Sequence, residues 1–226
     1  MRAAVLALLA VAAPAAADPL QDRVLAGMRG VETSDVGYTA TTAIERSGAA
    51  KQVIVTRYDP RAAAGQRWSV VRVDDRAPTV KERTQILKAA NGAPVPSYAR
   101  LAQWFGGPAT RVAQTATTVT FRFARLPAGT LKMGSHDASA DTVADAVVNT
   151  GAARPYVERV HFASAKPFRM ALVARVAHYD FYSGYAPLPD GRPFPTGTDG
   201  EISGSLMGKS GTLTTHSRDS DFRAAR

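Results

Sequence analysis

The sequence predicts an α+β protein whose main element is a strongly curved antiparallel sheet of about nine or ten strands. Alternation of apolar and polar residues with a period of two recurs along the chain, most cleanly in residues 117–126. Three short segments are predicted to be helices from their spacing of apolar residues. Several strands carry apolar residues on both faces, as at Val53, Ile54 and Val55, which is expected where a sheet wraps around a hydrophobic interior.

The first helix is predicted for residues 18–29, because Leu20, Val24 and Met28 recur four residues apart and share one face. Two further helices follow the third strand, at residues 80–90 and 97–105. Both are inserted into an otherwise β-rich chain, and the apolar stripe of the second could form a lid over a pocket or pack against the core.

Strands account for most of the remaining chain. They are predicted at residues 36–46, 52–60, 67–74, 117–126, 155–163, 168–184, 201–208 and 211–218. Residues 137–150 have some helical spacing, but their β-branched content favours a strand that ends near Thr150. The Pro- and Gly-rich residues 185–200 are predicted to form a long hairpin loop.

The acidic residues between the third strand and the second helix resemble a pair of catalytic carboxylates. Asp74 and Asp75, however, stand at the end of a strand, where aspartate commonly forms a turn. Thr79 and Glu82 fit a capping box for the following helix. We therefore expect these residues to be structural.

The N-terminus predicts export. Arg2 precedes an apolar run that Pro14 breaks, and the small residues before Asp18 fit a signal peptide that is cleaved after Ala17. The expected domains are therefore a signal peptide over residues 1–17 and a single domain over residues 18–226. We expect the mature chain to be a periplasmic monomer.

Composition excludes several kinds of site and favours one kind of surface. The chain has no cysteine, so it has no disulfide, thiolate nucleophile or thiolate metal site. Its net charge of +9 falls to +8 when Arg2 is removed with the signal peptide. An exported protein with this charge is attracted to anionic membrane surfaces. We expect no nucleic-acid partner, because the basic residues are scattered and the chain is exported.

Motifs for catalysis or cofactor binding are lacking in the sequence. His178 and Asp180 share a strand face, but no third metal ligand lies near them in the sequence. The segment before Lys209 resembles a phosphate-binding loop, yet Ser203 occupies the required first glycine position. We expect neither a metal, a cofactor nor a catalytic residue.

The order of elements resembles that of the LolA/LolB-like family of bacterial periplasmic carriers, which sort outer-membrane lipoproteins. The resemblance is carried by the signal peptide and first helix, by "RYDP…RW" and "VDDRAPT" before the helices, and by "GKSGTLTTHSRDSDFR" near the C-terminus. It implies an unclosed antiparallel β-barrel of about 9–11 strands, with helices that cover its concave side. It also implies non-covalent binding of a lipid, an acyl chain or a lipid-modified protein.

Side-chain alternation gives the residues expected to line such a cavity. The expected wall residues are Trp68, Val70, Val119, Phe121, Phe123 and Leu172, with Trp104 and Phe105 on the covering helix. The family's cavity arginine has four candidate positions here, and the residues expected to pair with a headgroup are Arg57, Arg72 and Arg122, with Arg125 as the fourth candidate.

Three classes of function follow. The first is a soluble carrier or binding module for a lipid, acyl chain or acylated protein. The second is a structural or regulatory envelope protein with a filled barrel that binds a protein partner. The third is a hydrolase of envelope lipid or glycan, which requires a convergent polar constellation inside the cavity.

Overall fold

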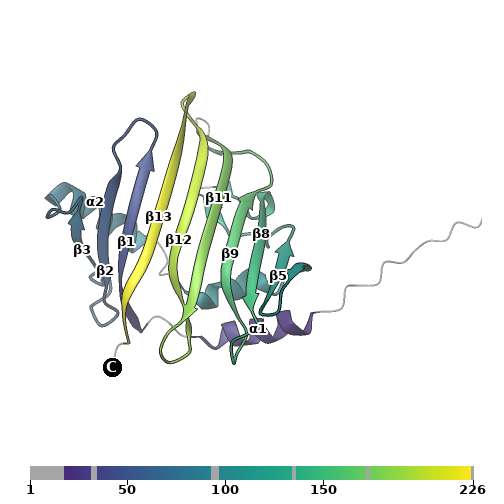
Figure 1. Ribbon diagram of the computed structural model, residues 1–226. Coiled ribbons are helices and arrows are strands. Elements are labelled where there is room, and N and C mark those ends of the chain that lie inside the picture. The colour runs from purple at the N-terminus through teal and green to yellow at the C-terminus, as the bar shows by residue number, and fades with distance from the viewer. Residues whose placement is uncertain (1–17, 32–34, 93–96, 134–135, 172–173, 225–226) are drawn as a thin grey trace, which may run out of the picture.

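Figure 1 shows the computed structural model, which describes residues 18–31, 35–92, 97–133, 136–171 and 174–224. Within these residues the chain forms one eleven-stranded antiparallel sheet and a separate two-stranded sheet. The helices are α1 (Pro19–Arg29), α2 (Val80–Gly92), α3 (Ala102–Phe105) and the 3-10 helices η1 (Tyr98–Leu101) and η2 (Ser139–Asp141).

The strands of the large sheet are β1 (Val36–Arg46), β2 (Gln52–Tyr58), β3 (Trp68–Val73), β4 (Thr110–Gln114), β5 (Thr118–Phe123), β8 (Thr142–Asn149), β9 (Tyr156–Ser164), β10 (Phe168–Ala171), β11 (Ala174–Pro187), β12 (Pro193–Leu206) and β13 (Lys209–Ala224). The small sheet consists of β6 (Lys132–Met133) and β7 (His136–Asp137).

The first and last strands of the chain are neighbours in the sheet. The order is β3-β2-β1-β13-β12-β11-β9-β8-β5-β4, and β10 pairs with β11 outside this path. The β1–β13 register runs from Val36 opposite Ala224 to Arg46 opposite Leu213. This pairing joins the N-terminal strands β1–β3 to the C-terminal strands in one sheet.

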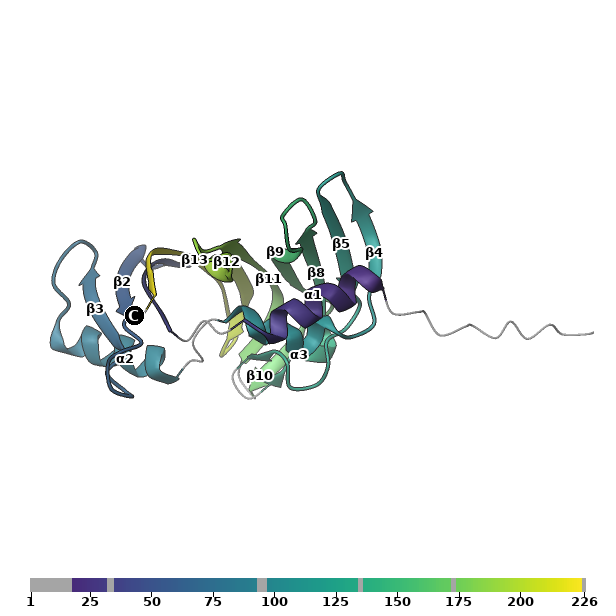
Figure 2. The same ribbon diagram turned by 90° about the horizontal axis from the view of Figure 1, so that it is seen from below.

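The sheet is open, and it is not strongly curled as the sequence had suggested. Its edge strands β3 and β4 lie at opposite ends of the strand order, and Figure 2 shows the two edges far apart. Apolar residues on both faces of a strand led to the expectation of a barrel, but they do not require a closed interior. Val55 is buried, whereas Val53 and Ile54 are only half-buried, so both faces of this strand are partly shielded without a closed interior.

Helices cover only part of one face of the sheet. Figure 2 shows α1 and α3 beside β9, β8 and β5, whereas α2 lies apart from them near the β3 edge. The largest hydrophobic core lies beneath α1, η1 and α3 and includes Met28, Phe105 and Phe123. In contrast, α2 buries no residue. The helical cover is therefore tightly packed at one end of the sheet and loosely attached at the other.

The local predictions for the helices and turns are largely confirmed. Asp18 caps α1 by accepting the backbone N–H of Leu20, at 2.9 Å. Asp74 and Asp75 both have a positive φ in the turn after β3. The Glu82 carboxylate accepts the backbone N–H of Thr79 at 2.8 Å, which completes the predicted capping box.

Two predictions about segment lengths were wrong. Residues 168–184 do not form one strand, because they are divided between β10 and β11. Residues 185–200 are not a long loop, because β11 extends to Pro187 and β12 begins at Pro193. Pro187 and Pro193 lie opposite each other at the loop end of the hairpin. At this position they do not interrupt the sheet. Within residues 137–150, the predicted strand is confirmed for Thr142–Asn149, which form β8, whereas Ser139–Asp141 form the 3-10 helix η2.

Candidate functional site

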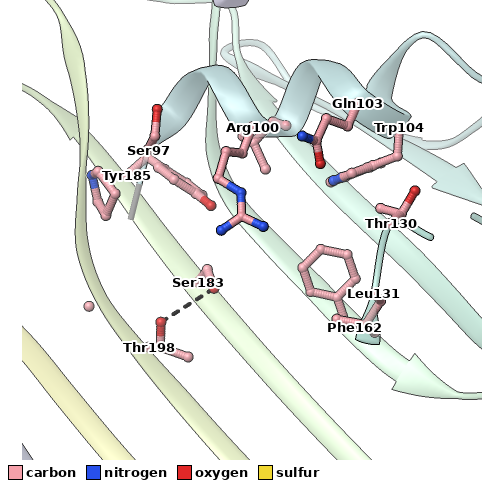
Figure 3. Close-up of a pocket in the computed structure, with 13 residues that line it drawn as sticks. Ser97, Arg100, Gln103, Trp104, Thr130, Leu131, Phe162, Ser183, Tyr185 and Thr198 are labelled. Atoms are coloured by element: carbon pink, nitrogen blue, oxygen red, sulfur yellow. Dashed lines mark hydrogen bonds between the residues drawn. The ribbon is translucent and has the colours of Figure 1, made fainter. Parts of the chain in front are cut away.

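A pocket of about 220 Å³ lies between the short helices η1 and α3 and the sheet (Figure 3). Leu101, Trp104, Leu131 and Phe162 give it an apolar part. Its polar lining residues are Ser97, Arg100, Gln103, Thr130, Ser183, Tyr185 and Thr198. The pocket therefore offers a small amphipathic surface at the border between the covered and the uncovered parts of the sheet.

Arg100 is the only charged residue among those that line this pocket. Figure 3 shows its guanidinium group extending from the helix toward the sheet, near Ser183. Its side chain is exposed and makes no hydrogen bond or ion pair with any residue that the structure describes. An unpaired guanidinium beside apolar side chains is suited to bind a carboxylate, sulfate or phosphate group.

The helix that carries Arg100 is held in place by its buried aromatic neighbours. Tyr98 accepts the backbone N–H of Val157 at 2.8 Å through its hydroxyl group. The Trp104 ring packs edge-on against Phe123 and Phe162, at centroid distances of 4.9 and 5.5 Å. Because these contacts hold the short helices against the sheet, the exposed side chain of Arg100 is held at the pocket.

Tyr185 adds a neutral hydroxyl group to the same pocket. Burial raises the pKa of Tyr185 to about 12, and the hydrogen bond with Ser183 and the positive charge of Arg100 only partly offset this rise. The phenol therefore stays protonated at neutral pH. It can donate a hydrogen bond to an anionic group that binds Arg100.

A second, larger pocket of about 670 Å³ lies at the end of the sheet near α1. It is lined by Val24, Ala26, Gly27, Gly30, Val31, Tyr98, Ala152, Ala153, Arg154, Pro155, Tyr156, Pro187, Asp190, Gly191, Arg192 and Pro193. Tyr98 lines this pocket and Tyr185 lines the smaller one, and their rings meet edge-to-face at 5.5 Å. This ring pair therefore forms part of the wall between the two pockets.

Most of the aromatic residues expected to line a cavity are part of a packed core. Phe105, Val119, Phe121 and Phe123 are all buried beneath α1 and α3. Trp104 is also largely buried, but it lines the smaller pocket as well.

The other expected wall residues lie elsewhere. Trp68 belongs to a separate aromatic cluster with Tyr38 and Tyr58. Val70 is half-buried on β3. Leu172 lies outside the described residues.

The arginines expected to bind a headgroup do not line the pocket that contains Arg100. Arg122 forms two hydrogen bonds with Asp145, at 2.8 and 2.7 Å. Arg72 lies 3.5 Å from Asp75. Arg57 lines a different, polar pocket of about 400 Å³ near the ends of β1 and β2. Sequence reasoning missed Arg100, although its position opposite the buried Tyr98 and Leu101 is a signal of an outward-facing residue.

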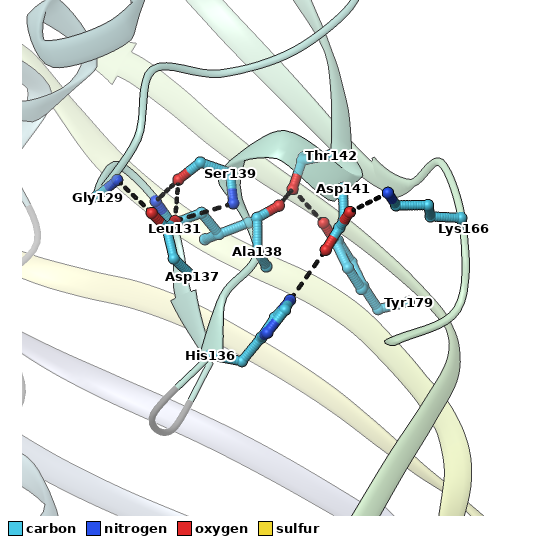
Figure 4. Close-up of polar contacts among 10 residues, drawn as sticks. All are labelled: Gly129, Leu131, His136, Asp137, Ala138, Ser139, Asp141, Thr142, Lys166 and Tyr179. Carbon is cyan, nitrogen blue, oxygen red and sulfur yellow. Dashed lines mark hydrogen bonds and ion pairs between the residues drawn. The ribbon is translucent and has the colours of Figure 1, made fainter. Parts of the chain in front are cut away.

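A cluster of polar side chains is centred on Asp141, and its hydrogen bonds connect residues of the fold to one another (Figure 4). Asp141 accepts a hydrogen bond from His136 at 2.9 Å and pairs with Lys166 at 3.0 Å. These two partners lower the pKa of Asp141, His136 more than Lys166. The hydroxyl of the neighbouring Thr142 bonds to Ala138 and Tyr179. Both carboxylate oxygens of Asp141 are therefore occupied, and the bond from Thr142 to Tyr179 of β11 fastens the end of η2 to the sheet.

Three histidines lie on the other face of the sheet, where His178 and His216 line a pocket of about 410 Å³. The His161 ring bonds to Asp180 at 3.1 Å, and His216 bonds to Asp199 at 2.9 Å. His178 lies 4.0 Å from Asp180. Among the described residues, no group of three or more His, Cys, Asp or Glu side chains is arranged to hold a metal ion.

Comparisons with protein-family models, with curated proteins and with solved structures found no match for this chain. No helix in the described part of the chain is long and apolar enough to span a membrane.

Proposed function

We propose that this protein is an exported binding protein or carrier for a lipid, acyl chain or lipid-modified protein with an anionic group. The observation that carries the proposal is the unpaired guanidinium group of Arg100, held beside the apolar side chains of Trp104 and Phe162. This combination of one cation and an apolar surface matches an amphipathic anion. The export step rests on the predicted signal peptide of residues 1–17.

The headgroup would bind at Arg100 with help from the Tyr185 phenol and the Ser183 and Thr198 hydroxyls. A charge-assisted hydrogen bond to Arg100 would fix its orientation. Nearby apolar contacts with Trp104, Leu131 and Phe162 would take the first part of the acyl chain. The lining of this pocket includes no Asp, Glu or His, so we do not extend the proposal to a hydrolase.

The larger pocket would accept the rest of the chain. Its volume of about 670 Å³ falls within the range of about 300–1,000 Å³ that is common for ligand sites. Val24, Pro155 and Pro187 give it apolar walls. A ligand that occupies both pockets would have to displace the Tyr185 ring from Tyr98.

One observation favours the alternative of a structural envelope protein that binds a protein partner. The interior beneath α1 and α3 is filled by Phe105, Phe121 and Phe123, each no more than 1% exposed. A ligand can therefore enter only beside this core and not beneath the helices. If the pockets stay empty in solution, partner binding becomes the better account.

Native mass spectrometry with phosphatidylglycerol and with a long-chain fatty acid would test the proposal. We expect a one-to-one adduct with the wild-type chain, and roughly ten- to a hundredfold weaker binding by Arg100→Gln, since one charge-assisted hydrogen bond is lost. Arg122→Gln is the matched control, because it removes the same charge from an arginine outside the pocket. A wild-type chain that binds no acyl compound would refute the carrier, and equal binding by both variants would refute the role of Arg100.

A further inference from the structure

The hairpin between β12 and β13 carries an apolar tip that the rest of the protein does not cover. Figure 1 shows this hairpin standing beyond the ends of the neighbouring strands. At its tip the side chains of Leu206 and Met207 are 60% and 77% exposed. Two adjacent, exposed apolar side chains at a projecting point are available to an external surface.

The backbone of this turn gives no reason for a methionine. Met207 and Gly208 have φ values of 50° and 79°, and positive φ at both central residues is the mark of a type I′ hairpin turn. Asn or Gly is usual at the first of these positions, because other residues are strained there. Met207 therefore exposes an apolar side chain and also occupies an unfavourable conformation, so turn formation does not explain it.

Unpaired positive charges surround the tip. Lys209 lies opposite Leu206 in the hairpin, and Arg175 lies opposite Ser205 on the adjacent strand. Arg169 pairs in register with Arg175. All three cations are exposed and form no ion pair with any described residue.

The rest of this end of the sheet does not neutralise these charges. Arg46, at the end of β1, is also exposed and without an ion-pair partner in the described chain. Of the acidic side chains nearby, Glu45 is matched by Lys51 at 2.9 Å and Asp141 by Lys166 at 3.0 Å, whereas the exposed Glu201 has no ion-pair partner in the described chain. The end of the sheet that bears the apolar tip therefore carries an excess of positive charge.

We propose that the β12–β13 tip docks on an anionic lipid surface. Leu206 and Met207 would enter the boundary between headgroups and acyl chains, as apolar side chains do in interfacial segments. Lys209, Arg175 and Arg169 would then lie at the level of the negatively charged headgroups. A membrane fits better than a protein groove, because the apolar area is small and the unpaired basic residues around it outnumber the one unpaired acidic residue, Glu201.

This docking site does not depend on the pocket at Arg100. The larger pocket lies at the Pro193 end of β12, and the tip lies at the Leu206 end. The strand between these ends has fourteen residues, which span about 43 Å at about 3.3 Å per step. Loss of lipid binding in the pocket and loss of docking at the tip are therefore separable.

Co-sedimentation with vesicles of phosphatidylglycerol and phosphatidylcholine would test the proposal, using the chain purified after export. We expect the wild type to bind these vesicles, to bind pure phosphatidylcholine weakly, and to dissociate as salt screens the charges. Met207→Asn is the decisive variant, because Asn suits the positive φ of the turn and removes the apolar side chain. It should bind at least about tenfold more weakly in combination with Leu206→Ser, while its thermal stability is retained.

Val80→Ser is the matched control, since Val80 is 84% exposed on α2, away from the tip. It should bind like the wild type, whereas Lys209→Gln should weaken binding to the anionic vesicles only. Wild-type chain that ignores anionic vesicles would overturn the proposal. Unchanged vesicle binding by the variant of Leu206 and Met207 would overturn it too. If this variant loses self-association but still binds vesicles, the tip is an interface between copies of the chain and the proposal is wrong.

Discussion

We expect Asp219 to make the stability of the protein depend on pH, and we expect one substitution to remove this dependence. It lies on β13 opposite Ala40, so its side chain is on the same face of the sheet as Tyr38. It has no hydrogen-bond or ion-pair partner in the described chain. Burial of this unpaired carboxyl raises its pKa from the ordinary 3.8 to about 6.

The size of the effect follows from this difference. A rise in pKa from 3.8 to about 6 corresponds to about 3 kcal/mol of free energy between the two protonation states. Because the pKa is higher in the folded state, the folded chain retains the proton more readily than the unfolded chain. The protonated Asp219 carboxyl therefore contributes its full stabilisation of the folded state below pH 3.8, and this contribution is lost as the pH rises through about 6.

Asp219→Asn replaces the ionisable group with a neutral group of similar shape. We expect the variant to gain up to about 3 kcal/mol relative to the wild type between pH 4 and pH 7.5. The assay is urea denaturation of both chains at several pH values, compared as a difference. Comparing differences cancels the contributions of the carboxyl groups that both chains share.

Asp221→Asn provides the matched control on the same strand. Asp221 is exposed and has a φ of 54°, which Asn tolerates. If the stability difference between the wild type and Asp219→Asn does not change between pH 4 and pH 7.5, Asp219 is not a buried, unpaired carboxyl and the reasoning is refuted. The same conclusion follows if the control reproduces the full effect.

Three further predictions concern helix capping, strand packing and the wall between the pockets. Thr79→Ala should destabilise the chain by about 1 kcal/mol in thermal or urea unfolding, because it removes the N-cap of α2; an unchanged stability would show that α2 contributes nothing to global unfolding. Gly204→Ala should unfold at a clearly lower temperature, since the added methyl group would overlap the backbone carbonyl of Arg175; a melting temperature equal to that of the wild type would contradict this packing. Tyr185→Ala should join the two pockets, because it removes one ring of the pair with Tyr98; mass spectrometry should then show tighter binding of longer fatty acids, and an unaltered chain-length preference would exclude a continuous site.

The local structure was predictable because its signals act over a few residues. The β5 alternation correctly placed Val119, Phe121 and Phe123 on the buried face. The capping box at Thr79 and Glu82 was recognisable because its two hydrogen bonds connect residues three apart. The same reasoning did not show that α2 would bury no residue, because helical spacing does not reveal which surface is present to receive a helix.

The candidate site depends on contacts between distant segments. Arg100, Phe162, Ser183 and Thr198 come from four parts of the chain, and alternation within each part does not bring them together. The surroundings of Arg122 likewise depend on a distant segment. Nothing in the sequence near Arg122 indicates that Asp145, on β8, is its partner.

The sequence by itself determined the α+β composition, the positions of most strands and the structural role of Asp74 and Asp75. These features depend on side-chain period, turn chemistry and capping, which are encoded locally. Only the tertiary structure decided that the sheet stays open and that β1 pairs with β13. Strand partners and curvature depend on register and packing between residues far apart in the chain, and a period of two is compatible with many such arrangements.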